Sequence, residues 1–255
     1  MDRNHDWIND PRQHYNDTDL RDIDTFISSD SRISTKEENL TVDYQTLNNN
    51  QKKVFNRIES HYHDVLVWHQ VEPLRIIVMG TAGTGKTYLI KAIRGRLQEM
   101  AGTGSKSPIV VLVPTGVAAF NINGRTIYSK LSIPIINDAK RLDIQGERLK
   151  QLQNKLKEVR YVIIDEKSMV GRRMFALIDM RLRQAFPEHN NEPFGGRSVI
   201  MLGDFGQLPP VRDLPMYAST KRDELSDSGF VAYKQFKEAY KLNVVQRQSG
   251  NSKEQ

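Results

Sequence analysis

Eight consecutive residues match the pattern G-x-x-x-x-G-K-[ST], a loop that binds the phosphates of a nucleotide. They are Gly80, Thr81, Ala82, Gly83, Thr84, Gly85, Lys86 and Thr87. In such a loop the backbone N–H groups face the phosphates, the lysine reaches the β- and γ-phosphates, and the last hydroxyl ligates Mg²⁺. A glycine-rich turn that fits by chance is the alternative. It is disfavoured because the apolar run 74–79 precedes the loop and a helical pattern begins at residue 88.

A pair of neighbouring carboxylates, Asp165 and Glu166, follows the apolar run 161–164. Catalysis of phosphoryl transfer is mostly positioning and charge stabilisation, for which a metal-binding carboxylate and a water-positioning base are needed. We expect Asp165 to hold Mg²⁺, usually through water, and Glu166 to act as the general base. An Asp-Glu pair alone is most often part of a solvated loop. A catalytic role is favoured here because a phosphate loop is also present, with its lysine 79 residues upstream of Asp165.

A third polar group, Gln207, follows the apolar run 198–202 and the dipeptide Gly203-Asp204. Its amide both donates and accepts hydrogen bonds, so it is a candidate sensor of the γ-phosphate and of a nearby water. For this residue alone, a loop glutamine without a role is an equally good interpretation.

The elements that must position these groups are short apolar, β-branched runs that alternate with helical patterns. Strands are predicted at about 75–79, 109–113, 161–164 and 198–202. Helices are predicted at 49–70, from 88 to about 100, at 117–120, at 174–186 and in part of the polar stretch 134–160. This alternation indicates an α/β fold, with a mostly parallel sheet and helices on both faces. Ligands bind beyond the carboxyl ends of such strands, where all three motifs fall.

No chemistry is assigned to His61, His63 or Trp68 of the predicted helix 49–70. His61 and His63 stand two positions apart, so their side chains face apart, and a surface or capping role is favoured over metal binding. Trp68 is predicted to be a packed helix residue. The chain has no cysteine, which excludes disulfides, a thiolate zinc site and a cysteine nucleophile.

Charge divides the chain into two parts. Residues 1–45 contain 11 Asp/Glu and 5 Lys/Arg, which leaves 20 of the 31 acidic and 32 of the 37 basic residues in 46–255. We expect the acidic, polar leader to be largely disordered. The basic remainder suggests a polyanionic partner such as nucleic acid, although a solubilising surface explains the charge equally well. An intracellular protein without a membrane span is expected, because no long apolar run and no secretory or mitochondrial leader is present.

Taken together, the motifs resemble those of superfamily 1 helicases, and in particular of their Pif1-like DNA helicase branch. Six segments match in the family's order: 47–51, 80–87, 115–129, 165–169, 203–211 and 242–248. The most specific is Gly-Asp-Phe-Gly-Gln-Leu-Pro-Pro-Val at 203–211. The resemblance implies a RecA-like phosphate-loop NTPase domain over 46–255 that hydrolyses ATP, with Mg²⁺, to unwind DNA. Roles in DNA repair and recombination, and a nuclear location, would follow from the family alone.

The resemblance also assigns roles around the nucleotide that the residues alone do not reveal. Gln51 would read adenine, and Arg247 would be an arginine finger that stabilises charge on the transferring phosphate. One departure from the family pattern lies in the second motif, where Lys167 occupies a position that is often apolar.

For the partner, the resemblance implies single-stranded DNA. Thr115 and Gly116, after the predicted strand 109–113, would grip its backbone, although by itself their segment is a tight strand-to-helix turn. Tyr128 stands where the family usually has histidine. It could stack on a base, or pack in the core instead.

The family has two motor domains, and this sequence ends eight residues after Arg247. We therefore expect the chain to hold the first motor domain only, with the second in a missing C-terminal half or a partner. Two functions stay open: an ATP-dependent DNA helicase, or a truncated domain that binds nucleotide and single-stranded DNA without unwinding. For the chain alone we expect ATP and Mg²⁺ binding with poor unwinding, which efficient strand separation would refute.

Overall fold

The computed structural model describes residues 42–68, 70–134 and 144–245. All described residues belong to one compact unit, Thr41–Gln255. Most of the predicted leader 1–45 and the predicted arginine finger Arg247 therefore lie outside the described residues.

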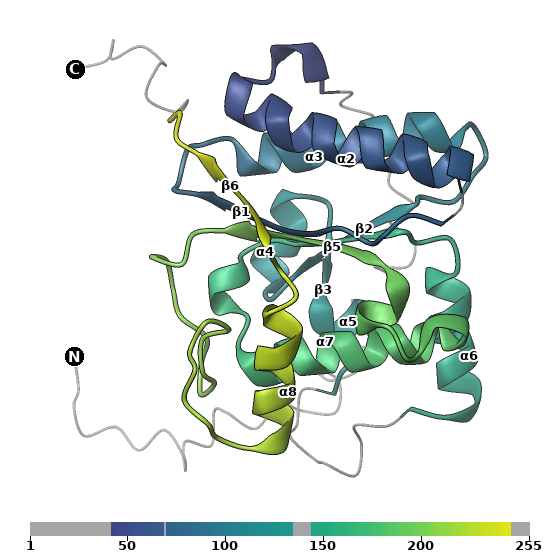
Figure 1. Cartoon of the computed structure of the whole chain (residues 1–255), viewed down its shortest axis with the longest axis vertical. Helices are drawn as coiled ribbons and strands as arrows, with labels where there is room; N and C mark the ends of the chain where they lie inside the picture. Colours follow the sequence, from purple (N-terminus) through teal and green to yellow (C-terminus); the bar gives the residue numbers. More distant parts are fainter. Residues whose placement is uncertain (1–41, 69, 135–143, 246–255) are drawn as a thin grey trace, which may run out of the picture. The chain divides into compact units, whose positions relative to one another are not determined.

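A six-stranded sheet in which every neighbouring pair is parallel forms the centre of this unit (Figure 1). Its strands are β1 (Arg75–Gly80), β2 (Ile109–Val113), β3 (Arg125–Thr126), β4 (Tyr161–Ile164), β5 (Ser198–Gly203) and β6 (Glu238–Leu242). Their order across the sheet is β3-β2-β4-β5-β1-β6. Since all strands run the same way, their carboxyl ends meet at one edge, and those of β4, β5 and β1 are neighbours there.

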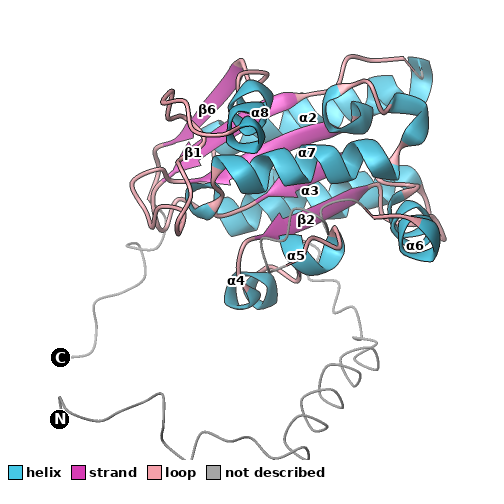
Figure 2. Ribbon diagram, turned by 90° about the horizontal axis from the view of Figure 1, so that it is seen from below, coloured by secondary structure: helices cyan, strands magenta, loops and turns pink. Residues whose placement is uncertain are grey.

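Helices cover both faces of the sheet. The helices are α2 (Asn49–Trp68), α3 (Lys86–Ala101), α4 (Gly116–Asn121), α5 (Ile127–Lys130), α6 (Gly146–Leu156), α7 (Arg172–Ala185) and α8 (Glu224–Tyr233). Figure 1 shows α2 and α3 on one side of the sheet and α6, α7 and α8 on the other. In the view of Figure 2, α4 and α5 lie beside β2, toward one margin of the sheet.

The strands divide their side chains between two hydrophobic cores, because successive residues of a strand point to opposite faces. In β1, Ile76 and Val78 pack in the core beneath α2 and α3, whereas Ile77 packs in the core shared with α7. The strands β2, β4 and β5 are buried along their whole length. Full burial is expected of a parallel sheet covered on both faces, and it holds the strand ends in fixed positions.

This architecture confirms the expected α/β class. The strands predicted at 109–113 and 161–164 have the observed bounds, and those predicted at 75–79 and 198–202 each extend one residue further. Two strands and two helices were not predicted: β3, β6, α5 and α8. The edge strand β6 alternates half-buried and exposed residues before its buried last residue, so it lacks the continuous apolar run that marks the other strands.

Two side chains of α2 differ from expectation. His61 is 4% exposed and lies inside the fold, against the predicted surface or capping role, because β4 and the segment before β1 enclose it. Trp68 is 71% exposed, against the predicted packing, because no residue of α2 beyond Tyr62 is buried. Among the described helices, none combines the length and apolar character that crossing a membrane requires.

Candidate functional site

The predicted phosphate loop is a tight turn between β1 and α3. Gly83 and Gly85 adopt positive φ values of 81° and 79°, which side chains rarely tolerate. Gly80 lies so close to the rest of the loop that a Cβ there would be 2.5 Å from the Thr84 hydroxyl oxygen. These glycines let the main chain curl around a small space at the start of α3.

Lys86 points its ammonium group into this loop. Its Nζ donates to the carbonyl oxygens of Gly80 at 2.8 Å and Thr81 at 3.0 Å. No side chain caps the start of α3, since its N-cap residue is Gly85, so the first backbone N–H groups of the helix have no side-chain acceptor. The loop thus combines a lysine cation with helix N–H donors, a combination suited to an anion.

Gln51 fixes this loop from the start of α2. The side chain is fully buried, and its Nε2 donates to the carbonyl oxygens of Thr84 and Gly85, each at 3.3 Å. Its Oε1 accepts from the backbone N–H of Asn48 at 3.0 Å. The residue predicted to read adenine therefore hydrogen bonds with the main chain just before α2 and with that of the loop.

Asp165 and Glu166 lie at the carboxyl end of β4. Asp165 is 5% exposed, and burial raises the pKa of its carboxyl to about 6, with a further rise from the nearby Glu166 charge. Its Oδ1 accepts from the backbone N–H of Glu166 at 2.9 Å, which lowers that pKa, as do the charges of Lys86 and Lys167. Glu166 is half-buried and adopts a positive φ of 55°, an uncommon conformation that turns the chain sharply at this point.

Gln207 belongs to the turn that follows β5. The backbone N–H of Gln207 donates to Asp204 O at 3.1 Å, and that of Gly206 donates to Asp204 Oδ1 at 2.9 Å. Because β5 lies between β4 and β1, this turn stands between the carboxylate pair and the phosphate loop. Three segments far apart in the sequence, carrying Lys86, Asp165-Glu166 and Gln207, are thus brought to one edge.

One residue at this edge of the sheet, Lys167, was noted in the sequence only as a departure from the family pattern. Lys167 is fully buried, donates from Nζ to Gly203 O, and lies 4.2 Å from the centroid of the Phe205 ring. Burial lowers the pKa of its ammonium to about 8, while the negative charges of Asp204, Asp165 and Glu166 raise it. The Asp-Glu-Lys tripeptide after a strand locates this lysine in the sequence, but nothing there indicates its burial.

The residues predicted to contact DNA lie further along the same edge. Thr115 caps α4 by accepting from the Ala118 N–H at 3.3 Å, and a Cβ at Gly116 would meet nothing within 4 Å. Tyr128 is half-buried against the core, which accords with its second interpretation. On α4, Val117 is 76% exposed and Phe120 is 90% exposed, an apolar pair that sequence reasoning did not assign.

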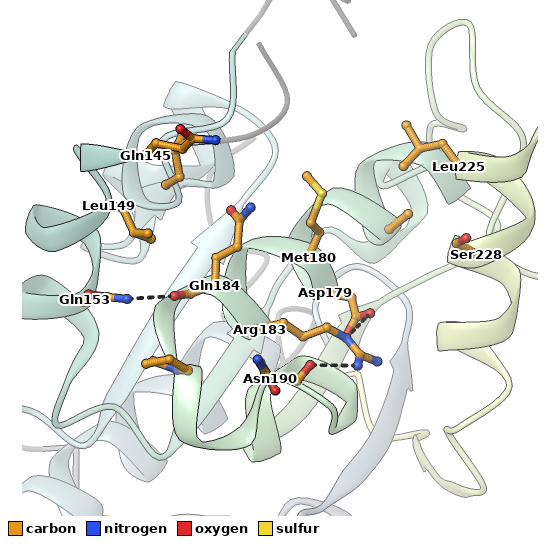
Figure 3. A pocket seen from close by; sticks show the side chains of 13 residues that line it. Gln145, Leu149, Gln153, Asp179, Met180, Arg183, Gln184, Asn190, Leu225 and Ser228 are labelled. Carbon is orange, nitrogen blue, oxygen red and sulfur yellow. Dashed lines mark hydrogen bonds and ion pairs between the residues drawn. The ribbon is translucent and has the colours of Figure 1, made fainter. Parts of the chain in front are cut away.

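Two cavities lie near these elements. A cavity of about 360 Å³ adjoins the phosphate loop and is lined from the ends of β1, β5 and β6, including Thr81, Asp204 and Lys241. A larger one, about 580 Å³, lies among α6, α7 and α8 (Figure 3). In that cavity Arg183 pairs with Asp179 at 2.8 Å, and no residue of the three motifs lines it. The smaller cavity is therefore the one that belongs to the candidate site.

The fold and the site define an α/β nucleotide-binding domain of the phosphate-loop type, with a RecA-like arrangement of its sheet. The family model described as PIF1-like helicase matches residues 46–255, and the chain therefore belongs to the PIF1-like helicase family.

Individual relatives agree with this assignment. The chain is 35% identical over 137 residues to an ATP-dependent DNA helicase Pif1 from a Psychrobacter species, which covers 53% of this chain and 20% of the relative. Among solved structures, Pif1 helicase from Candida albicans matches with a TM-score of 0.59 and 27% identity, over 80% of this chain and 41% of that one. Pif1 from Bacteroides, in complex with ADP-AlF3 and single-stranded DNA, matches with a TM-score of 0.56 and 30% identity, over 80% and 43%. The chain thus spans less than half of these proteins.

Proposed function

We propose that this chain is the nucleotide-binding motor domain of an ATP-dependent DNA helicase. The observation that carries the proposal is the meeting, at one sheet edge, of an uncapped phosphate loop containing Lys86, the pair Asp165-Glu166, and the Gln207 turn. This set of parts serves phosphoryl transfer, in which positioning and charge stabilisation supply most of the catalysis. Family membership, and a relative that has been crystallised with ADP-AlF3 and single-stranded DNA, support the choice of ATP and DNA.

In this proposal the phosphate loop binds ATP. The backbone N–H groups from Gly80 to Thr87 receive the phosphates, and Lys86 exchanges its loop carbonyl partners for the β- and γ-phosphate oxygens. Gln51 supports the loop at its adenine side. Its contacts to the loop carbonyls suit this positioning role in addition to the predicted reading of adenine.

The donors at the site fit Mg²⁺. The exposed Thr87 at the start of α3 and the buried Asp165 offer hard oxygen ligands, as this ion requires, and Mg²⁺ commonly combines few protein ligands with substrate phosphates. Among the residues that the structure describes, no cluster of three or more His, Cys, Asp or Glu could hold a metal. When bound, Mg²⁺ would neutralise phosphate charge, and Thr87 and Asp165 would hold it.

For hydrolysis, Glu166 is the proposed general base and Gln207 the proposed sensor of the γ-phosphate. Both are half-buried at the ends of the neighbouring strands β4 and β5, and β5 pairs with β1, the strand that leads into the phosphate loop. Arg247, which follows β6 along the chain, is the proposed arginine finger.

Single-stranded DNA is proposed to cross the edge at α4 and α5. Thr115 and Gly116 leave their turn open to a phosphate, since nothing crowds Gly116. The exposed Phe120 supplies a ring on which a base could stack, and Tyr128 is a second aromatic in the adjacent helix. Arg125 and Lys130 add positive charge, and burial, followed by the nearby Arg125 charge, lowers the pKa of Lys130.

The test is ATP turnover by the purified chain with and without single-stranded DNA, beside Lys86→Ala and Glu166→Gln. We expect DNA to stimulate hydrolysis and both variants to lower kcat by at least about 100-fold, as losses of transition-state charge stabilisation and general-base catalysis do. Lys106→Met, an exposed change in the loop before β2 and so at the opposite edge, should act like wild type. Turnover that survives Lys86→Ala would contradict the proposal.

The second candidate, a domain that binds nucleotide and DNA without unwinding, is the less favoured, because the relatives are named as ATP-dependent DNA helicases. Strand separation in this family would need two domains that close and open on the nucleotide in alternation. Other enzymes use similar closures of lids or domains. A strand-separation assay with the chain alone tests this point, and poor unwinding is the expected result.

A further inference from the structure

Lys167 joins the two segments that carry the proposed hydrolytic groups. It begins the 3₁₀ turn η4 (Lys167–Met169), directly after the carboxylate pair, and is fully buried. Its main chain packs against the last residue of β5, because a Cβ at Gly203 would lie 2.9 Å from the Lys167 backbone nitrogen. The ends of β4 and β5 therefore touch at this residue.

The ammonium group at the end of the Lys167 side chain also contacts the end of β5. Nζ donates to the carbonyl oxygen of Gly203 and lies 4.2 Å from the centroid of the Phe205 ring. Phe205 lies in the same turn as Gln207, whose N–H donates to Asp204 O. The ammonium group thus holds both the beginning and the middle of the turn that carries the proposed γ-phosphate sensor.

Burial of the Lys167 ammonium group at this position is energetically unfavourable. An ammonium group has three donors, and here the described residues provide one carbonyl acceptor, one ring face and no carboxylate in ion-pair contact. A buried charge with so few partners lowers the stability of the fold relative to an apolar side chain of the same size. A side chain with this cost, lying between two active segments, is expected to serve the site.

We propose that Lys167 is a positioning residue that couples the carboxylate pair after β4 to the Gln207 turn after β5, so that both respond together to the γ-phosphate. This inference rests on the proposed binding of nucleotide at the phosphate loop. A γ-phosphate contact at Gln207 moves the turn, the Gly203 carbonyl and Phe205 carry that movement to the ammonium, and the main chain of Lys167 carries it to Glu166. ADP, which lacks the γ-phosphate, does not engage this connection.

The experiment compares the full chain with Lys167→Met, which keeps the length of the side chain and removes the charge and the donors. Binding of fluorescent ADP and of a fluorescent non-hydrolysable ATP analogue is measured with Mg²⁺, together with ATP turnover and thermal unfolding. We expect the wild-type chain to bind the ATP analogue more tightly than ADP. In Lys167→Met we expect ADP affinity to change less than about twofold, this preference to disappear, and kcat to fall about 10- to 100-fold, as small misplacements of catalytic groups do. The Tm should stay the same or rise. The matched control is the exposed Lys106→Met.

The outcomes separate the inference from the proposed function. A wild-type chain that binds neither nucleotide overturns the proposed function and the inference with it. A wild-type chain that binds and turns over ATP, beside a Lys167→Met variant with the same nucleotide preference and the same kcat, overturns the inference alone. A variant that loses activity only in proportion to a lowered Tm also overturns it, because that result assigns Lys167 to the stability of the fold.

Discussion

Two buried cations, Arg172 and Lys167, are five residues apart in the chain but differ greatly in their hydrogen-bond partners. Arg172, at the start of α7, is 1% exposed and donates to Ser226 O at 2.9 Å, Ala218 O at 3.2 Å, Thr220 O at 2.5 Å and Asp227 Oδ1 at 2.5 Å. Lys167 is equally buried, yet it donates to a single carbonyl and faces one ring.

The difference follows from location. Arg172 ties α7 to α8 and to the loop before it, none of which belongs to the three motifs, and four of its five N–H donors have a protein acceptor in place of water. Lys167 lies among the charged groups Asp165, Glu166, Asp204 and Lys86, where the surrounding atoms are arranged for a ligand. The comparison teaches that burial of a charge alone does not indicate its purpose, whereas the completeness of its hydrogen bonds does.

The largest expected effect is the loss of the Arg172 guanidinium, which makes four hydrogen bonds. Arg172→Met should lower the free energy of unfolding by about 3–5 kcal/mol, the usual cost of breaking a buried charged network. Urea unfolding measures it, with Arg173→Met as the control. Arg173 pairs with Asp223 at 2.7 Å, but both side chains are about a third exposed, so its loss should cost at most about 1 kcal/mol. Equal effects of the two variants would remove the contrast between the buried cations.

Gly229→Ala, which places a methyl group against the Arg172 main chain, should have the next largest effect on the free energy of unfolding. A Cβ at Gly229, in α8, would lie 1.9 Å from the carbonyl oxygen of Arg172, so Gly229→Ala must push α7 and α8 apart. We expect a loss of at least about 1–3 kcal/mol in urea unfolding, as overpacking costs. In the helical control Gly95→Ala, the new Cβ meets nothing within 4 Å, and a gain of about 0.5–1 kcal/mol is expected. A neutral result at Gly229 would mean that the two helices are not closely packed.

Phe205→Leu should weaken the nucleotide edge with a smaller change in stability. It removes the ring face 4.2 Å from the Lys167 ammonium, an interaction worth about 0.5–2 kcal/mol. We expect kcat for ATP to fall about threefold to tenfold. Tyr217→Leu, which removes only an edge contact on the same ring at 5.1 Å between centroids, should change kcat less than twofold.

A double-mutant cycle sharpens this prediction. If the ring acts through the ammonium, Phe205→Leu should have no further effect on kcat in a Lys167→Met chain, because the partner is already gone. Additive losses would show that Phe205 acts on the turn by packing alone.

The sequence predicted the parts of the fold that have a continuous apolar pattern and missed those that do not. The central strands β2 and β4 were predicted with their observed bounds, since strands buried on both faces have an unbroken apolar run. The edge strand β6 was missed because its side chains alternate. The phosphate loop and the strand-end carboxylates were found because their chemistry fixes residue type and spacing together.

What the sequence could not indicate is how charged and aromatic side chains are enclosed. Lys167 and Arg172 read as ordinary polar residues beside a motif, and only the neighbouring chain segments, distant in sequence, show that both are buried. The same applies to His61 and to Trp68, because only the segments packed against α2 show that the first is buried and the second exposed. Helical periodicity says which residues share a face, and it does not say how far along the helix that face is covered.

His61 adds a buried base that is neutral, and it has the smallest expected effect. Its Nε2 lies 2.9 Å from Glu72 O, which can only accept, so Nε2 carries the proton and Nδ1 accepts from the Tyr161 hydroxyl at 2.6 Å. Burial lowers the pKa of His61 below its ordinary value of 6.5. The unfolded chain therefore binds a proton at higher pH than the folded chain does, and stability is lost as pH falls below about 6.5.

His61→Gln keeps one donor and one acceptor and removes this titration. The loss of unfolding free energy between pH 7.5 and pH 5.5 should be smaller in the variant than in wild type, as measured by urea unfolding at both values. Asp165 acts in the opposite direction, because its raised pKa favours the folded chain as pH falls, but it is present in both chains and drops out of the difference. His63→Gln, an exposed change on the same helix, is the control. An unchanged pH dependence in His61→Gln would mean that His61 keeps its ordinary pKa in the fold, and that burial in this core does not keep the imidazole neutral.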